Sequence, residues 1–194
     1  MNKKKEIALI GDPILRKATN FVDINKINSS LIQNIITELI DTMRYLNGAG
    51  LAANQIFYPY RLCVIEMISN PRYKYFPVIP LKVLINPKIE INKRAEIFSS
   101  YEGCLSVPNL RGKVDRYTEI KISYYNEKAD FCSEKVKGIS AVVYQHEIDH
   151  LDGVLFTDKV KNNKTLVTYD NYLKYHDANY NDEVKKFIEK KLFN

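Results

Sequence analysis

The sequence has few of the residues that stabilise small secreted domains or that mark repeats. It contains three cysteines, Cys63, Cys104 and Cys132, among 194 residues. Three cysteines cannot all pair within one chain, and a cytosolic setting would keep them reduced, so we expect free thiols. We expect the cytoplasm because the sequence shows neither a membrane-spanning run nor a signal peptide. Seven glycines and seven prolines, without any low-complexity tract, exclude a collagen-like or repetitive chain.

Long hydrophobic runs are also lacking. No apolar stretch approaches the roughly 20 residues of a membrane-spanning helix, and no apolar segment follows the lysines near the N-terminus as it would in a signal peptide. With 45% hydrophobic residues, the chain can still form a substantial core. We predict a single domain over residues 1–194, with a basic tail from about residue 162.

The charge balance is moderate, with 29 basic and 23 acidic residues and a net charge of +6. Such a mixed surface gives no reason to expect DNA or a membrane as partner. In the tail, lysines at 185, 186, 190 and 191 flank Phe187, Ile188 and Leu192, which predicts a solvated amphipathic helix. Contact of this helix with ribosomal RNA is the functional alternative.

The first half of the chain predicts a helix followed by strands. Apolar residues recur at helical spacing over residues 31–46, and Ser30 and Gln33 suit a capping box at its start. Residues 61–67 and 81–85 have the composition of strands, the second ended by Asn86 and Pro87. We expect an ordered loop between them, from Ser69 to Pro80.

The second half predicts an antiparallel sheet and a buried helix. Apolar and polar residues alternate over residues 118–124, and a turn at 126–130 leads into a strand at 131–137. Residues 139–153 are apolar on nearly every side, which is typical of a helix in the middle of a protein. A further amphipathic helix is predicted at 184–193. Together these patterns predict an α+β fold, with antiparallel sheets around a central helix and a helix at the C-terminus.

The central helix carries the sequence QHEIDH at residues 145–150. His146 and His150 are two of only three histidines, and their spacing of four puts both on one face of a helix. They could bind one metal ion, with Glu147 reaching a water beside it. A chance occurrence on a solvated helix is the alternative, but an apolar helix would bury these polar groups at a cost that a metal relieves.

Two ligands do not hold a catalytic metal, so a third is needed. Phe156 stands where one protease class has its third histidine, which excludes that class. Glu183 or Glu189 could serve as in a gluzincin-like peptidase, although both lie in the lysine-rich tail. The remaining candidate is Cys104, in the sequence EGCLS. Outside enzymes, the alternative hypothesis is a binding protein with a structural zinc, but such a site needs a fourth protein ligand.

At this point the chain resembles the peptide deformylase family, because three motifs occur in the family's order. GAGLAANQ at 48–55 matches GxGLAAxQ, EGCLS at 102–106 matches directly, and QHEIDH at 145–150 continues into LDG as in the family. GDPILR at 11–16 also resembles the family's opening. The resemblance covers most of the chain to about Lys159.

The resemblance implies Cys104, His146 and His150 as metal ligands, with iron(II) as the metal in the cell and zinc, nickel or cobalt as alternatives. It implies a hydrolase that removes the N-formyl group from the initiator methionine of nascent peptides and releases formate. Glu147 would carry the proton of the attacking water to the departing nitrogen. The side-chain amide of Gln55 and the backbone N–H of Leu105 would stabilise the oxyanion.

The resemblance also implies how the peptide is bound. Backbone groups of Ala49, Gly50 and Gly103 would pair with it as an added strand. The remaining implied binding residues are Arg111, for the following carbonyls, and a methionine pocket formed by Val142, Val143 and His146, with Ile139 near its edge. Glu102 and Arg116 would form a structural ion pair behind the site, and we expect a monomer.

Two departures from the family pattern bear on substrate preference. The segment from Ser69 to Pro80 is longer and more aromatic than in compact members, and Ser100 and Tyr101 replace what is often an apolar pair. Outside the motifs, Cys63 and Cys132 are interpreted as small apolar residues of strands. His176 is interpreted as a surface histidine.

Overall fold

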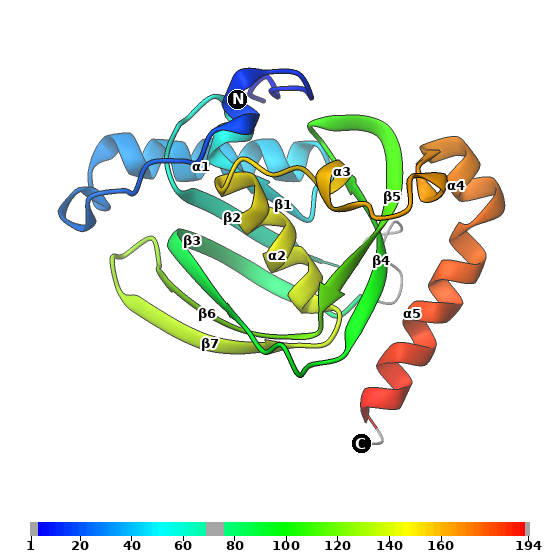
Figure 1. Cartoon of the computed structure of the whole chain (residues 1–194). Helices are drawn as coiled ribbons and strands as arrows, with labels where there is room; N and C mark the ends of the chain where they lie inside the picture. Colours follow the sequence, from blue (N-terminus) through cyan, green and yellow to red (C-terminus); the bar gives the residue numbers. More distant parts are fainter. Residues whose placement is uncertain (1–3, 69–75, 193–194) are drawn as a thin grey trace.

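The computed structural model describes residues 4–68 and 76–192 and has two antiparallel sheets with helices around them (Figure 1). The helices are α1 Ser30–Tyr45, α2 Ser140–Leu151, α3 Phe156–Lys159, α4 Tyr169–Tyr175 and α5 Asp177–Leu192. The strands are β1 Gly50–Ala52, β2 Leu62–Met67, β3 Ile79–Ile91, β4 Ile97–Cys104, β5 Val107–Tyr117, β6 Glu119–Tyr125, β7 Phe131–Lys137 and β8 Val167–Thr168. Short 3₁₀ helices include η1 Pro13–Arg16 and η3 Ala53–Ile56.

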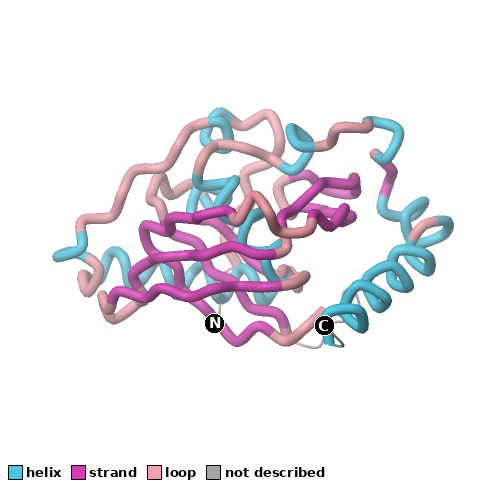
Figure 2. Tube along the Cα trace, turned by 60° about the horizontal axis from the view of Figure 1, so that its bottom comes forward, coloured by secondary structure: helices cyan, strands magenta, loops and turns pink. Residues whose placement is uncertain are grey.

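The larger sheet has the strand order β1-β2-β3-β6-β7, and the smaller has the order β4-β5-β8. All the pairings between these strands are antiparallel, and Figure 2 shows the larger sheet from its side, with α5 lying apart from it. The predicted α+β fold with a C-terminal helix is therefore confirmed. In this order β1 and β4 are edge strands, which becomes important at the site.

Helix α1 is confirmed, but its N-cap is one residue earlier than predicted. Ser29 has extended backbone angles, and its hydroxyl accepts a hydrogen bond from the N–H of Ile32 at 3.4 Å. Ser30 is already the first helical residue. Gln33 does not close a capping box with Ser30; its side-chain amide donates to the carbonyls of Ile27 and Glu127, each at 2.9 Å.

Strand β3 is longer than the sequence predicted. Asn86 and Pro87 were expected to end it, because proline cannot donate to a ladder, but the strand continues to Ile91. Asn86 adopts φ +53°, and the pairing with β6 shifts register between Ile85 and Lys88. The irregularity lets the strand pass the proline and pair again beyond it. Of the loop predicted from Ser69 to Pro80, residues 69–75 lie outside the described residues, and β3 has already begun at Ile79.

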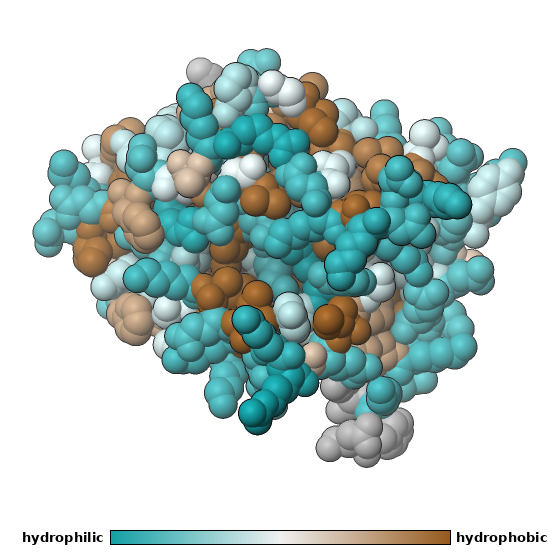
Figure 3. Space-filling view, in the orientation of Figure 1, coloured by the Kyte–Doolittle hydropathy of each residue, from teal (hydrophilic) through white to brown (hydrophobic). Residues whose placement is uncertain are grey.

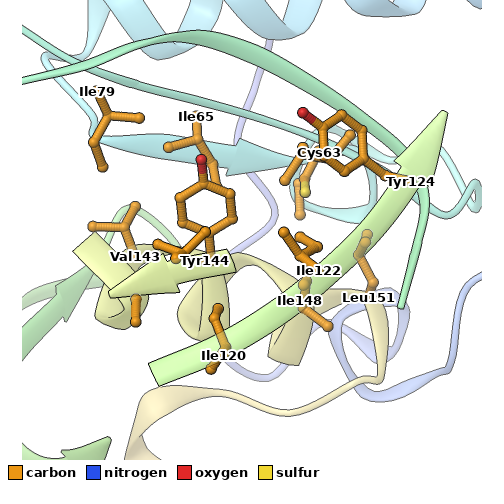
Figure 4. Packing of buried hydrophobic residues seen from close by; sticks show 14 of the residues in the cluster. Cys63, Ile65, Ile79, Ile120, Ile122, Tyr124, Val143, Tyr144, Ile148 and Leu151 are labelled. Atoms are coloured by element: carbon orange, nitrogen blue, oxygen red, sulfur yellow. The ribbon is translucent and has the colours of Figure 1, made fainter. Parts of the chain in front are cut away.

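Helix α2 lies across the larger sheet, as the all-round apolar pattern predicted. Figure 4 shows Tyr144 of this helix pointing towards Ile65 of β2 and Ile148 lying beside Ile122 of β6, all within one buried cluster. Ten of its twelve residues are buried, including His146, Glu147 and His150. Because burial of apolar surface is the main stabilising contribution to a fold, this packing fixes the position of the histidines firmly.

The C-terminal part of the chain packs against the domain more closely than predicted. Helix α5 begins at Asp177, seven residues before the predicted start, and its residues Tyr180, Val184 and Phe187 are buried. They form a cluster with Phe98 of β4 and with Tyr172, Ile139 and Val142. The predicted amphipathic helix is therefore present, but it is not merely solvated, because its apolar face packs on the domain while Lys185, Lys186 and Lys190 are exposed.

The surface in Figure 3 is predominantly hydrophilic, with hydrophobic side chains in small separate groups. Within residues 4–68 and 76–192, no helix has the length and apolarity needed to cross a membrane.

Candidate active site

Three side chains predicted to bind a metal converge at the end of β4 and on α2. Cys104 is the last residue of β4, and the two-residue connection Leu105–Ser106 leads into β5. The Sγ atom of Cys104 lies 3.2 Å from Nε2 of His150. The two Nε2 atoms of His150 and His146 are also 3.2 Å apart. Within the described chain these residues are the group of ligand-type side chains that could hold an ion.

The donor set fits a divalent metal ion. In a tetrahedral site with metal–nitrogen bonds near 2.0–2.1 Å and metal–sulfur bonds near 2.3 Å, donor atoms lie about 3.3 to 3.6 Å apart. The observed separations of 3.2 Å are close to that range. One thiolate and two imidazoles suit iron(II), zinc, nickel or cobalt better than magnesium or calcium, which prefer oxygen ligands. Glu183, the alternative ligand, instead pairs with Lys113 at 3.1 Å on the surface.

The candidate metal ligand His146 is oriented by a buried ion-pair network. Its Nδ1 lies 2.8 Å from Oε2 of Glu102, so a proton on Nδ1 leaves the Nε2 lone pair for a metal. Glu102 accepts two hydrogen bonds from Arg116, at 2.6 and 2.8 Å, as the predicted ion pair requires. Arg116 also donates to Asp149 at 2.6 Å, a partner that the sequence reasoning did not identify.

The electrostatics of this network keep its members charged. Burial by itself would raise the pKa of Glu102, but Arg116 and the hydrogen bond with His146 lower it to about 2. Burial likewise opposes ionisation of Cys104, yet His150 and His146 bring the pKa of its thiol well below the usual range. A thiolate is the form of cysteine that binds a metal.

Glu147 lies next to this group and faces the same space. The carboxyl group is buried, and its Oε2 has no hydrogen-bond partner among the described residues. Burial raises the pKa of Glu147 to about 7, although positive charge on His146 and His150 opposes the change. Gly50 lies so close that a Cβ there would collide with the Glu147 side chain. The edge strand β1 therefore fixes where the carboxylate can lie.

Gln55 completes the opposite side of the site. It lies on η3, directly after β1, and its Oε1 accepts a hydrogen bond from the N–H of Ala52 at 2.8 Å. This bond orients the amide so that Nε2 donates to Ser106 Oγ at 3.0 Å and to Cys104 Sγ at 3.4 Å. Ser106 is a further residue that the sequence reasoning missed, although it belongs to the EGCLS motif.

A cavity of about 550 Å³, hereafter the central cavity, opens beside these groups. It lies between the edge strands β1 and β4, which contribute Gly50 and Gly103. Its other lining residues from the predicted set are Ala49, Gln55, Glu102, Cys104, Leu105, Arg111, Val142, Val143, His146 and Glu147. Ile139 is the exception among the predicted substrate-binding residues, because it packs in the cluster behind Val142 and does not line the cavity. The predicted metal ligand His150 is buried and does not line it either.

Arg111 is held against the β4 backbone. A Cβ on Gly103 would collide with its guanidinium group, so only glycine permits this approach. The guanidinium lies 4.5 Å from the centre of the Tyr169 ring, and Nη1 donates to the Leu110 carbonyl at 2.9 Å. Arg111 thus has a fixed direction at the cavity edge.

Sequence reasoning also missed residues outside the motifs or at their variable positions. Asn54 was given no role, but it is fully buried, and its amide donates to the His150 carbonyl at 2.6 Å, joining η3 to α2. His176 was interpreted as a surface residue but is half-buried, with its ring 5.7 Å from that of Tyr101. The interpretation of Cys63 as a buried strand residue is confirmed, and Cys132 is half-buried in β7.

Known proteins resemble both the sequence and the fold. Residues 4–166 match the family described as polypeptide deformylase. Peptide deformylase 2 of Nostoc sp. is 38% identical over 86% of this chain and 91% of its own length. A class I type b peptide deformylase from Acinetobacter baumannii, solved with Met-Ala-Ser bound, is 33% identical with a TM-score of 0.79, over 82% of this chain and 100% of that one. A peptide deformylase from Synechococcus elongatus, solved with actinonin, has a TM-score of 0.73 at 34% identity, over 85% of this chain and 86% of that one.

Proposed function

The chain belongs to the polypeptide deformylase family, and from this membership we propose which of its residues perform the family's reaction. The reaction is metal-dependent hydrolysis of the N-formyl group on the N-terminal methionine of newly synthesised polypeptides, with release of formate. The observation that carries the assignment is the convergence of Cys104, His146 and His150 beside the unpartnered carboxylate of Glu147.

Cys104, His146 and His150 are the proposed metal ligands. A divalent ion bound there supplies Lewis acidity, which polarises a carbonyl and lowers the pKa of water. Three protein ligands leave a position open for substrate, whereas a structural site is closed by a fourth. This arrangement favours catalysis over a structural zinc, and the exposed position of Glu183 disfavours a gluzincin-like peptidase.

Glu147 is the proposed proton carrier. Its carboxylate takes a proton from the attacking water and returns it to the nitrogen of methionine as the C–N bond of the formamide breaks. The contact with Gly50 and the burial of the side chain hold the carboxylate at the cavity wall, where the transfer requires it.

Gln55 and the backbone N–H of Leu105 are the proposed donors to the oxyanion. Leu105 lies in the connection between Cys104 and Ser106, and both Gln55 and Leu105 line the central cavity. The hydrogen bond from Ala52 to Gln55 orients the amide N–H groups before substrate arrives. Prior orientation matters because donors that are already aligned need no reorganisation during the reaction.

The peptide is proposed to bind as an extended strand between the edges of β1 and β4. Backbone groups of Ala49, Gly50 and Gly103 pair with it, which makes binding largely independent of the peptide's sequence. Val142 and Val143 contact the methionine side chain, while Ile139 supports this pocket from behind. Arg111 lies at the cavity edge, where its guanidinium group can donate to later peptide carbonyls.

The test uses anaerobically purified protein with formyl-Met-Ala-Ser and with an internal peptide as alternative substrate. We expect formate from the first and no cleavage of the second. Glu147→Gln, which keeps size but cannot accept the proton, should lower kcat by roughly 10²- to 10⁴-fold. Formate release unaffected by that substitution would refute the assigned role, and internal cleavage without formate would favour a peptidase.

We propose iron(II) as the metal in the cell because membership of the family implies it; the donor set of one thiolate and two imidazoles suits iron(II), zinc, nickel and cobalt alike. Elemental analysis of protein prepared without oxygen should find about one iron per chain. Zinc at that stoichiometry, with full activity and no iron, would contradict the proposal.

The substrate places the protein where translation occurs, and we propose the cytoplasm as that location and a monomer as the working form. A salt-dependent contact with the ribosome through the exposed lysines of α5 is also proposed. Lys186 pairs with Asp182 at 2.7 Å and Lys190 with Glu96 at 3.1 Å, which reduces the charge available to RNA. Salt-sensitive cosedimentation with ribosomes should vanish in the double variant Lys185→Glu, Lys186→Glu; unchanged cosedimentation would contradict the contact.

A further inference from the structure

The C-terminal segment contributes a wall to the central cavity, although it lies beyond the residues that match the family. That match ends at residue 166, and the whole of the Acinetobacter baumannii chain is covered by 82% of this one. The segment's cavity-lining residues, hereafter the C-terminal wall, are Tyr169, Tyr172, Leu173, Asp177 and Tyr180. They line the same cavity as Gln55, Cys104 and Glu147.

The C-terminal wall is fixed to β4 by the two residues that depart from the family pattern. The hydroxyls of Ser100 and Tyr180 lie 2.6 Å apart in a hydrogen bond that is buried. The Tyr101 ring packs edge-on against two other rings, with its centre 5.2 Å from that of Tyr172 and 5.6 Å from that of Tyr180. An apolar pair at 100 and 101 could not make the hydroxyl contact, so this part of β4 and the C-terminal wall are matched to each other.

The wall also adjoins both sides of the proposed peptide site. Tyr172 belongs to the same buried cluster as Val142, which also lines the cavity in the proposed methionine pocket. On the other side, the Tyr169 ring supports the Arg111 guanidinium. The wall therefore borders the cavity between the proposed methionine pocket and Arg111.

In an extended peptide, side chains two residues apart point in the same direction and lie roughly 7 Å from each other. If methionine is the first residue, the side chain that shares its direction is the third. We propose that the C-terminal wall binds the third residue of the formylated peptide and favours an apolar side chain there. The proposal rests on the function proposed above and extends it to substrate preference.

The chemistry of the wall supports an apolar occupant. Tyr172 is 7% exposed and Leu173 is 50% exposed, and both line the cavity. An exposed leucine beside aromatic rings gains free energy when an apolar side chain covers it. Asp177 also lines the cavity, at the start of α5, and its carboxylate accepts a hydrogen bond from the Tyr172 hydroxyl.

The experiment compares formyl-Met-Ala, formyl-Met-Ala-Leu and formyl-Met-Ala-Ser in a formate assay. The unmodified protein should have the highest kcat/KM for the peptide with leucine third. Leu173→Ala should lower that value roughly three- to tenfold through KM, with kcat and the value for formyl-Met-Ala unchanged. Tyr175→Ala is the matched control, because Tyr175 lies on the same helix, is 59% exposed and is not part of the wall.

A charge substitution gives a second readout. Leu173→Glu should shift the preference several-fold from a third leucine to a third lysine, since a carboxylate would attract the ammonium group. Two outcomes would overturn the proposal: equal kcat/KM for the leucine and serine peptides in the unmodified protein, or equal effects of Leu173→Ala and Tyr175→Ala. In both cases formate release would still support the proposed function. Absence of formate from all three peptides would instead refute the function, and this inference with it.

Discussion

At the scale of single residues, two glycines determine the geometry of the site because each has a larger side chain pressed against it. Gly50 lies against the Glu147 carboxylate, and Gly103 lies against the Arg111 guanidinium. The motif GAGLAANQ identifies Gly50, but not what it contacts, since Glu147 is 97 positions later in the chain. The requirement for glycine here arises from space and not from a turn.

Gly50→Ala should therefore impair catalysis without unfolding the protein. The added methyl group would displace Glu147, and a displacement of about 1 Å in a catalytic group can cost roughly 10²-fold in rate. We expect kcat to fall by that order while the metal content by elemental analysis stays at the level of the unmodified protein. A variant with normal kcat would show that Glu147 does not need this position.

We expect Glu102 to be a positioning residue that would act on a bound metal through its hydrogen bond with His146. Glu102→Gln would remove the charge that balances Arg116 and weaken the hydrogen bond to Nδ1 of His146. Loss of such a partner typically costs 10- to 100-fold in metal affinity. Competition with a chelator measures this affinity. Glu134→Gln, which disturbs the partly exposed pair with Lys82, is the control and should leave affinity unchanged; equal affinities in both variants would contradict the assigned role.

At the scale of elements, the helices and strands that the sequence predicted correctly are those in which one apolar face is buried and the other is exposed, so that hydrophobic periodicity identifies them. Helix α1 and strand β6 each bury one face, so spacing alone identified them. The extension of β3 past Pro87 was missed because a register shift, which has no sequence signal, accommodates the proline. Helix α5 was placed too late and as solvated, because its buried face includes Tyr180 and depends on partners in β4.

The same distinction applies to the site. The ligands and Glu147 could be predicted because each stands in a motif whose chemistry is recognisable. Asp149 and Ser106 were missed although both lie within motifs, because their roles depend on which side chain faces them in space. The tyrosines of the C-terminal wall have no motif at all, and only the folded chain brings them to the cavity.

Because α5 packs on β4 through aromatic residues, its buried face should contribute to stability. Phe187 is 8% exposed, and its ring lies 4.8 Å from that of Phe98. Phe187→Ala should lower the free energy of unfolding by about 3 kcal/mol, measured by urea denaturation. Lys186→Ala, on the exposed face of the same helix, should change it by less than about 0.5 kcal/mol. Equal effects would mean that α5 is not part of the cooperative unit.

At the scale of the whole molecule, the metal group adds to the polar contacts that already join two parts of the fold, such as the hydrogen bond between Glu102 and His146 and the ion pair between Arg116 and Asp149. Cys104 belongs to the hairpin of β4 and β5 in the smaller sheet, whereas His146 and His150 belong to α2, which packs on the larger sheet. An ion bound by all three would therefore connect the sheets across the central cavity. A connection of this kind should stabilise the folded state, because the unfolded chain cannot present the three ligands together.

Removal of the metal should accordingly lower the thermal stability of the entire protein. A ligand at a thousand times its Kd adds about 4 kcal/mol to stability, and each kcal/mol shifts Tm by about 2–4 °C in a domain of this size. We expect Tm to fall by roughly 8–16 °C on chelation and to recover when iron(II) or zinc is added back. Cys104→Ala should abolish the response to added metal, while Cys63→Ala, which alters a buried cysteine of β2 outside the ligand group, should retain it. If both cysteine variants responded to metal equally, Cys104 could not be the ligand that links the two sheets.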